Sequence, residues 1–286
     1  MNKQNHLATS NNSNDQINLL MKEYYEYTLR WTTNSNYFAS QSLYSWMAEK
    51  VKGKERILEV GCGVGVSTQT LLNEGHIIVA LDENPECICA AHERVIKSYE
   101  AEKFIRANRL IIDGEIETAY ADIDIKNNTH KALFVESNIA TDACLESQLP
   151  EMSMDGVVCW LIGTHWKNRE YDRNMKLIDA INPEVYRNSI HELIFQKADK
   201  FLKPDGVIHI VDRGTRCIDD DQIQSFTQFY SFLARGTGFE LSNYDQFHYD
   251  GSEISKGVLM GAKGKSLKKS ELQKSALHSI LFTKVI

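Results

Sequence analysis

The sequence has no long apolar run and no internal linker. None of its apolar segments approaches the roughly 20 residues that a membrane-spanning helix needs. The N-terminus is polar and lacks the apolar core of a secretory signal peptide. No stretch rich in Pro, Gly or Ser divides the 286 residues. We therefore expect a soluble, cytoplasmic protein with one domain, since an α/β domain of this length is ordinary.

Paired cysteine motifs and an excess of basic residues are also missing. The six cysteines form no C-x-x-C pairs, so buried thiols are expected rather than disulfides or a metal site. His191, His209 and His248 lack metal-ligand spacing with nearby acidic residues, and we expect no metal. The net charge of −7 argues against a general nucleic-acid-binding protein, which needs a basic surface. One basic cluster is present, and we interpret it as a solvated loop, with a docking surface as the alternative: Lys256, Lys263, Lys265, Lys268, Lys269 and Lys274.

The most informative segment of the chain is residues 56–68. A short apolar run with β-branched members ends in Glu59, and three alternating glycines and a helix-compatible segment, Ser67–Asn73, follow. This order predicts a strand, a tight turn and a helix. Glycine permits positive φ values and lets a ligand approach bare backbone, and the helix N-terminus offers unpaired N–H groups. The turn therefore predicts a site for a polar or anionic small molecule.

The spacing of these glycines separates two cofactor interpretations. Dinucleotide-binding proteins carry G-x-G-x-x-G, whereas this chain has G-x-G-x-G. The segment Glu59-Val60-Gly61-Cys62-Gly63-Val64-Gly65 resembles the class I (Rossmann-like) S-adenosyl-L-methionine-dependent methyltransferases of the small-molecule type. Four further stretches in the expected order, including Leu202–Gly206 before an apolar strand, extend the resemblance over roughly residues 20–285.

The resemblance implies an α/β fold and a cofactor. The fold is a doubly wound, seven-stranded, mostly parallel sheet whose last strand is antiparallel and inserted near the edge. The cofactor is S-adenosyl-L-methionine. Alternating strands and helices along the chain independently favour a parallel sheet covered on both faces.

The chain divides by composition into a tail, a lid and a core. Residues 1–15 are too polar to bury surface and are expected to be a disordered tail. Residues 16–52 have a helical pattern and are expected to form a lid over the cofactor, although their aromatic side chains could instead simply pack on the sheet. Residues 53–286 form the expected core. Its insertions lie at about 99–131, 160–191 and 245–276.

Two elements are predicted within these insertions. Leu110–Ile112 and Glu115–Glu117 flank Asp113-Gly114, which is typical of a β-hairpin. Residues 167–201 are expected to form a helical region that is broken near Asn182-Pro183.

The expected strand ends and the resemblance together identify cofactor-binding candidates. Asp82 ends the apolar run Ile77–Asp82, where a carboxylate can accept both hydroxyls of a ribose; a helix N-cap is the alternative. Asn138 and Ile139 follow the next strand and match the family's adenine-binding positions, with a loop turn as the alternative. The full set is Tyr25, Glu59, Gly61, Cys62, Gly63, Gly65, Asp82, Glu83, Asn138, Ile139 and Trp160.

His165 is the candidate catalytic residue. The strand Asp155–Leu161 is expected to be central, so Ile162–Trp166 should emerge at the carboxyl ends of the strands, where open α/β sheets bind ligands. Imidazole titrates near neutral pH and suits a general base. The alternative is a histidine that shapes the loop by hydrogen bonding.

Three functions stay open at this point. The first is methyl transfer to an O or N atom of a small metabolite or natural product. The second is an RNA or protein methyltransferase that docks through the segment Lys256–Lys274. The third is a non-catalytic S-adenosylmethionine-binding module. No N-P-P-Y tetrapeptide follows the fourth strand, which disfavours methylation of adenine amino groups and glutamine amides.

Overall fold

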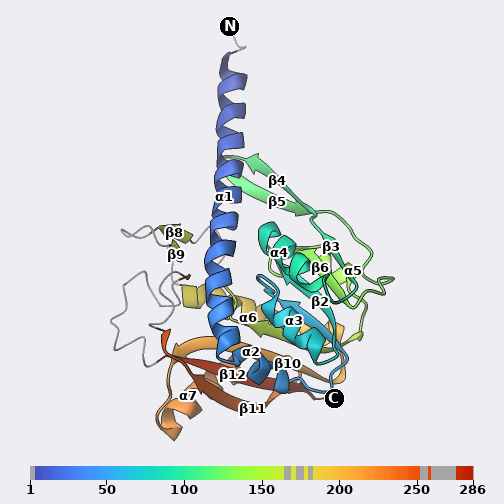
Figure 1. Ribbon diagram of the computed structural model, residues 1–286, viewed down its shortest axis with the longest axis vertical. Helices are drawn as coiled ribbons and strands as arrows, with labels where there is room; N and C mark the ends of the chain where they lie inside the picture. The colour runs from blue at the N-terminus through green and yellow to red at the C-terminus, as the bar shows by residue number, and fades with distance from the viewer. Residues whose placement is uncertain are drawn as a thin grey trace.

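A computed structural model gives the fold for most of the chain. It describes residues 4–163, 169–171, 177–179, 183–251, 257–258 and 275–285. Its centre is an eight-stranded sheet in the order β11-β12-β10-β7-β1-β2-β6-β3 (Figure 1). The strands of this sheet are β1 (Arg56–Val60), β2 (Ile77–Asp82), β3 (Ala101–Phe104), β6 (Ala132–Glu136), β7 (Met154–Trp160), β10 (Leu202–Thr215), β11 (Phe239–His248) and β12 (Ser275–Lys284).

The sheet is parallel except at its C-terminal strands. β12 pairs antiparallel with β10 on one side and with β11 on the other, as the resemblance implied for the last strand. The sheet has eight strands, not the predicted seven. The additional strand is β3, which lies in the first predicted insertion and pairs parallel with β6 at the edge.

Helices cover both faces of the sheet, which explains why the central strands are nearly continuous apolar runs. Ile57 of β1 packs on the face covered by α1 (Gln4–Ser40), α2 (Leu43–Glu49), α3 (Val66–Asn73) and α4 (Pro85–Val95). Its neighbour Leu58 points to the face covered by α5 (Leu145–Gln148), α6 (Pro183–Phe201) and α7 (Asp220–Leu233). Among the described residues, no helix is long and apolar enough to cross a membrane.

Helix α1 begins earlier than the sequence suggested. Residues 4–15 continue the helix, although the sequence predicted a disordered tail over 1–15. No Pro or Gly interrupts this polar stretch, so nothing in it stops the helix. Figure 1 shows the N-terminal part of α1 projecting away from the sheet.

The insertions contain two small hairpins. β4 (Ala107–Ile112) and β5 (Glu115–Tyr120) confirm the predicted hairpin, and Asp113 and Gly114 have φ values of 52° and 83°, as the favoured tight turn requires. The predicted helix over 167–181 is wrong where the structure describes it. β8 (Arg169–Tyr171) pairs antiparallel with β9 (Leu177–Asp179), and α6 begins only at Pro183.

All six cysteines are free thiols, as expected. Cys62, Cys87, Cys159 and Cys217 are buried, and the other two are partly exposed. Within the described part of the chain, no group of His, Cys, Asp and Glu side chains could hold a metal ion.

Candidate functional site

A pocket that is partly open to solvent lies at the carboxyl ends of the parallel strands. Loops that follow β1, β2, β6 and β7 form its floor, α1 covers it, and α6 closes one side. From these elements come Gly61 and Gly63; Asp82, Glu83 and Asn84; Ser137, Asn138 and Ile139; Leu161, Ile162 and Gly163; Tyr27 and Trp31; and Tyr186 and Ile190.

The glycine turn presents bare backbone to this pocket. The N–H groups of Gly61 and Cys62 donate to the Leu81 carbonyl at 2.8 and 2.9 Å, which fixes the turn against β2. A Cβ atom on Gly61 would lie 2.5 Å from Ile162 Cδ1, and one on Gly63 would lie 2.4 Å from Trp31 Nε1. Both glycines have positive φ, so both the backbone geometry and the contacts require glycine.

The Asp82 carboxylate is oriented by two backbone donors. Oδ2 accepts from the Gly63 N–H and Oδ1 from the Asn84 N–H, both at 2.9 Å. Asn84, not Asp82, caps helix α4, because its Oδ1 accepts from the N–H groups of Glu86 and Cys87. A carboxylate oxygen can accept more than one hydrogen bond.

Asn138 forms the turn that the sequence offered as the alternative, and it also borders the pocket. Its Oδ1 accepts from the Ala140 N–H at 2.9 Å and so forms a turn. Its Nδ2 donates to Glu83 Oε2 at 2.9 Å, and Asn138, Glu83 and Ile139 all border the pocket.

Several predicted cofactor-binding residues lie outside the pocket lining that the described residues form. Cys62 is buried beside the turn, and Tyr25 is 54% exposed on the outer side of α1. Trp160 points away from the pocket and donates from Nε1 to His209 Nδ1 at 3.0 Å. A Cβ on Gly65 would lie 2.7 Å from Ala91 Cα, so this glycine allows α3 and α4 to pack closely.

Glu59 also has a role beneath the turn rather than in the pocket. It is 1% exposed and accepts hydrogen bonds from the hydroxyls of Ser67 and Thr68 at the start of α3. Burial raises its pKa to about 7, although these two hydroxyls act in the opposite direction. Glu59 therefore ties the end of β1 to α3.

Comparisons with known proteins support the architecture. No protein-family model matches the sequence, and no curated protein matches it either. Among solved structures, the [4+2]-cyclase SpnF has a TM-score of 0.50 and 12% identity, over 85% of this chain and 80% of that chain. Two others have lower TM-scores. A SAM-dependent methyltransferase from Methanosarcina mazei has a TM-score of 0.44 and 13% identity, over 82% of this chain and 94% of its own. The N-methyltransferase NodS from Bradyrhizobium japonicum, in complex with S-adenosyl-L-homocysteine, has 0.43 and 10%, over 86% of each chain.

The chain has a doubly wound, Rossmann-like α/β fold. At these identities the likeness concerns the fold, and the chemistry must be argued from the site itself.

Another side of this Rossmann-like pocket is held by a buried ion pair and by a hydrogen bond to the backbone. Arg187 of α6 donates from Nε to Asp212 at 3.0 Å, and Arg213 donates from Nη2 to the Ile162 carbonyl at 2.9 Å. Burial alone raises the pKa of Asp212, but Arg187 lowers it overall. These contacts fix the loop after β7 against β10 and α6.

Two predicted features fall outside the described residues. His165 is one, although Gly163, two positions earlier, lines the pocket. The basic segment Lys256–Lys274 is the other, apart from residues 257–258.

The sequence predicted a lid over residues 16–52, but the cofactor-binding candidates did not include the residues that line the pocket from α1 and α6. Tyr27 and Trp31 are four residues apart, and their rings stack at a centroid distance of 6.4 Å. Residues four apart in a helix lie on the same face, so this spacing predicts that the two rings face the same way. Tyr186 and Ile190 have the same spacing, but no pattern in the sequence pointed that face of α6 toward the pocket.

Proposed function

We propose that the pocket binds S-adenosyl-L-methionine and that the protein transfers its methyl group to an O or N atom of a small metabolite or natural product. One observation carries the proposal. The oriented carboxylate of Asp82 borders the same pocket as the bare backbone of Gly61 and Gly63.

The pocket residues fit the parts of this cofactor. Asp82 offers acceptors for the two ribose hydroxyls, and Ile139 offers an apolar surface for adenine beside the amide of Asn138. The ends of the Ile162 and Trp31 side chains pack against Gly61 and Gly63, and in this proposal they move aside so that the amino-acid end lies against bare backbone.

When bound, the cofactor supplies an activated methyl group on a sulfonium. The chain contributes position: the acceptor would lie between the loop Leu161–Gly163 and the α6 residues Tyr186 and Ile190. Holding a nucleophile in line with the methyl can supply on the order of 7 to 11 kcal/mol of the barrier. The apolar side chains there, with Trp31 above, exclude water.

We assign proton removal to His165, which follows the pocket residue Gly163 by two positions. His165→Ala should lower kcat by about 10² to 10⁴-fold once an acceptor is known. Its affinity for S-adenosyl-L-homocysteine should stay unchanged, because the interaction operates mainly in the transition state. An unchanged rate and pH profile would leave positioning alone as the mechanism.

A second candidate function is cofactor binding without methyl transfer. The observation that favours it is the likeness to SpnF, which is described as a [4+2]-cyclase rather than a methyltransferase. Proteins of this fold therefore include catalysts of other reactions.

Thermal melts with S-adenosyl-L-methionine, S-adenosyl-L-homocysteine and NAD test the cofactor. At 100 times the dissociation constant, the cofactor or its product should stabilise the native state by about 2.7 kcal/mol. NAD should have no effect, and Asp82→Ala should weaken the two expected ligands. Stabilisation by NAD alone would overturn the proposal.

A cofactor with a labelled methyl group then separates the functions. We expect label in small molecules of a cell extract. Label in RNA or protein would support docking through Lys256–Lys274, and binding without transfer would support the second candidate.

A further inference from the structure

The hairpin β4–β5 contacts the helix that covers the pocket. Leu20 and Tyr24 of α1 are 1% and 2% exposed, and they form an apolar cluster with Ile116 of β5. Met21 and Ile111 pack against its edge. Figure 1 shows the hairpin beside α1, on the side where the helix leaves the sheet. An insertion in the Rossmann-like core therefore supports the lid.

Arg109 lies at the centre of this contact. Its Cζ lies 5.4 Å from the centroid of the Tyr24 ring on α1. Its Nη2 donates to Glu136 Oε1 at 2.5 Å and to the Glu83 carbonyl at 3.4 Å. Burial lowers the pKa of Arg109, but Glu136 and Tyr24 raise it overall, so the guanidinium stays charged. One side chain thus joins the lid, the hairpin and the rim of the pocket.

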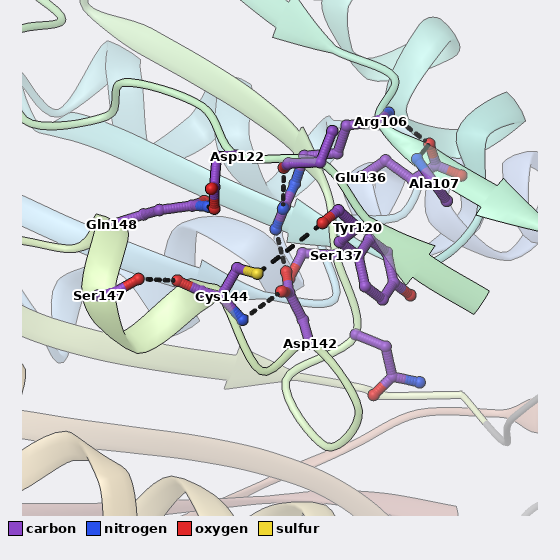
Figure 2. Close-up of polar contacts among 12 residues, drawn as sticks. Arg106, Ala107, Tyr120, Asp122, Glu136, Ser137, Asp142, Cys144, Ser147 and Gln148 are labelled. Carbon is purple, nitrogen blue, oxygen red and sulfur yellow. Dashed lines mark hydrogen bonds and ion pairs between the residues drawn. The ribbon is translucent and has the colours of Figure 1, made fainter.

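Glu136 connects Arg109 to the loop that forms part of the pocket floor. The residue is fully buried at the end of β6, and its Oε2 accepts from the N–H groups of Arg106 and Ala107 at 2.8 and 2.9 Å. Ser137, directly after it, lines the pocket and donates to Asp142 at 2.7 Å. Figure 2 shows that Arg106 also reaches Asp142, where it contacts the same carboxylate oxygen, Oδ2, as Ser137.

We propose that Arg109 is a positioning residue that couples helix α1 to the adenine end of the pocket. The inference rests on the proposed cofactor, since the loop after Glu136 is assigned to adenine. Arg109 holds Glu136 and Tyr24 together, so the loop and the lid take their binding positions jointly. Loss of the guanidinium leaves Glu136 buried with one donor fewer and removes the cation from the Tyr24 ring.

A simple structural ion pair would stabilise the fold without this coupling. The two roles differ in one measurable respect: coupling makes the effects of Arg109 and Tyr24 on ligand affinity depend on each other. A double-mutant cycle therefore decides between them. Its members are Arg109→Gln, Tyr24→Leu and the double variant. Thr118→Ala is the matched control, because Thr118 lies directly opposite Arg109 in the hairpin.

Calorimetry with S-adenosyl-L-homocysteine gives the first readout. Arg109→Gln and Tyr24→Leu should each bind about tenfold more weakly than the wild type, and Thr118→Ala should bind like the wild type. The double variant should bind within about twofold of the weaker single variant. A double variant whose loss equals the product of the two single losses, or wild-type affinity in Arg109→Gln, would overturn the proposal.

Hydrogen exchange without ligand gives the second readout. In Arg109→Gln, amides of residues 20–32 should exchange faster, while those of α3 should exchange as in the wild type. Faster exchange confined to the hairpin, or raised throughout the protein, would refute the coupling. If Arg109→Gln does not fold, Arg109→Lys keeps a cation for Glu136 without the planar group over Tyr24, and its affinity should fall about threefold.

The two readouts distinguish this inference from the proposed function. If the wild type binds neither S-adenosyl-L-methionine nor S-adenosyl-L-homocysteine, the proposed function fails. Hydrogen exchange of the amides in residues 20–32 is measured without ligand, so it still tests whether Arg109 holds the lid.

Discussion

Glu59 is a carboxyl group in a site where ionisation is unfavourable. Its pKa rises from 4.5 to about 7 on folding because of burial. Between these values the folded state binds more protons than the unfolded state, so the free energy of unfolding falls as the pH rises from about 4.5 to above 7. The full difference is on the order of 3 kcal/mol.

Glu59→Gln removes this titration while keeping the side-chain shape. We expect the melting temperature of the wild type, relative to Glu59→Gln, to increase as the pH is lowered from about 8 to about 5. Calorimetric melts across this range provide the measurement. A constant difference between the two proteins would show that the carboxyl group does not titrate there.

Gly65 and Gly53 give a matched pair of glycines. Both have positive φ, 78° and 81°, so alanine is strained at either position. A Cβ on Gly65 meets the backbone of Ala91, whereas one on Gly53 has nothing within 4 Å. Gly65→Ala should therefore cost about 1 to 3 kcal/mol more than Gly53→Ala in urea unfolding. Equal losses of unfolding free energy in the two variants would mean that α4 moves away from the new Cβ at little cost.

At the scale of elements, α1 should report ligand binding through Trp31. The Trp31 ring is 7% exposed and lies against Gly63, next to the proposed amino-acid end of the cofactor. S-adenosyl-L-homocysteine should change the tryptophan fluorescence of the wild type, because it changes the surroundings of this ring. Most of the change should disappear in Trp31→Phe. An undiminished signal in that variant would place the ligand away from the lid.

The sequence predicted the elements that are buried on both faces. Continuous apolar runs such as Ile77–Asp82 identified β2 and its neighbours, since burial on both faces leaves a clear pattern. β3 gave no such pattern, because each of its four residues is only partly buried. β8 and β9 have three residues each, too few for a period to be recognised.

The same reasoning explains which predicted residues border the pocket. Gly61 follows β1 directly and Asp82 ends β2, so both reach the pocket at the carboxyl ends of these strands. Trp160 lies outside the pocket lining of the described residues; consecutive strand residues face opposite sides, and the sequence alone did not show which side faces the pocket. Tyr25 also lies outside that lining, because Tyr27 and Trp31 share a helix face on which Tyr25 does not lie.

At the scale of the whole molecule, the last strand joins distant parts of the chain. β12 lies between β10 and β11, and its Phe282 is 1% exposed. The Phe282 ring packs edge-on against Phe195 of α6 at a centroid distance of 4.8 Å. The stability of the sheet should therefore depend strongly on Phe282.

Phe282→Ala should lower the free energy of unfolding by about 3 to 5 kcal/mol. Thr283→Ala, at the next and less buried position, should change it by less than about 1 kcal/mol. Urea unfolding followed by circular dichroism measures both. Similar small losses would show that the packing on α6 relaxes to fill the cavity.

The lid helix also carries a consequence for the order of events during protein synthesis. Asn34 of α1 is fully buried. Its Nδ2 donates to the Val258 carbonyl at 3.2 Å, and its Oδ1 accepts from the Val258 N–H at 2.7 Å. The two residues are 224 positions apart in the chain. At about 5 to 20 residues per second, the ribosome needs roughly 11 to 45 s to make the chain between them. Until Val258 is made, the lid helix α1 lacks these two hydrogen bonds, although β1, β2, β6 and β7 have already been synthesised. A chaperone or a ligand that meets the growing chain would find the glycine turn more accessible than it is in the finished molecule.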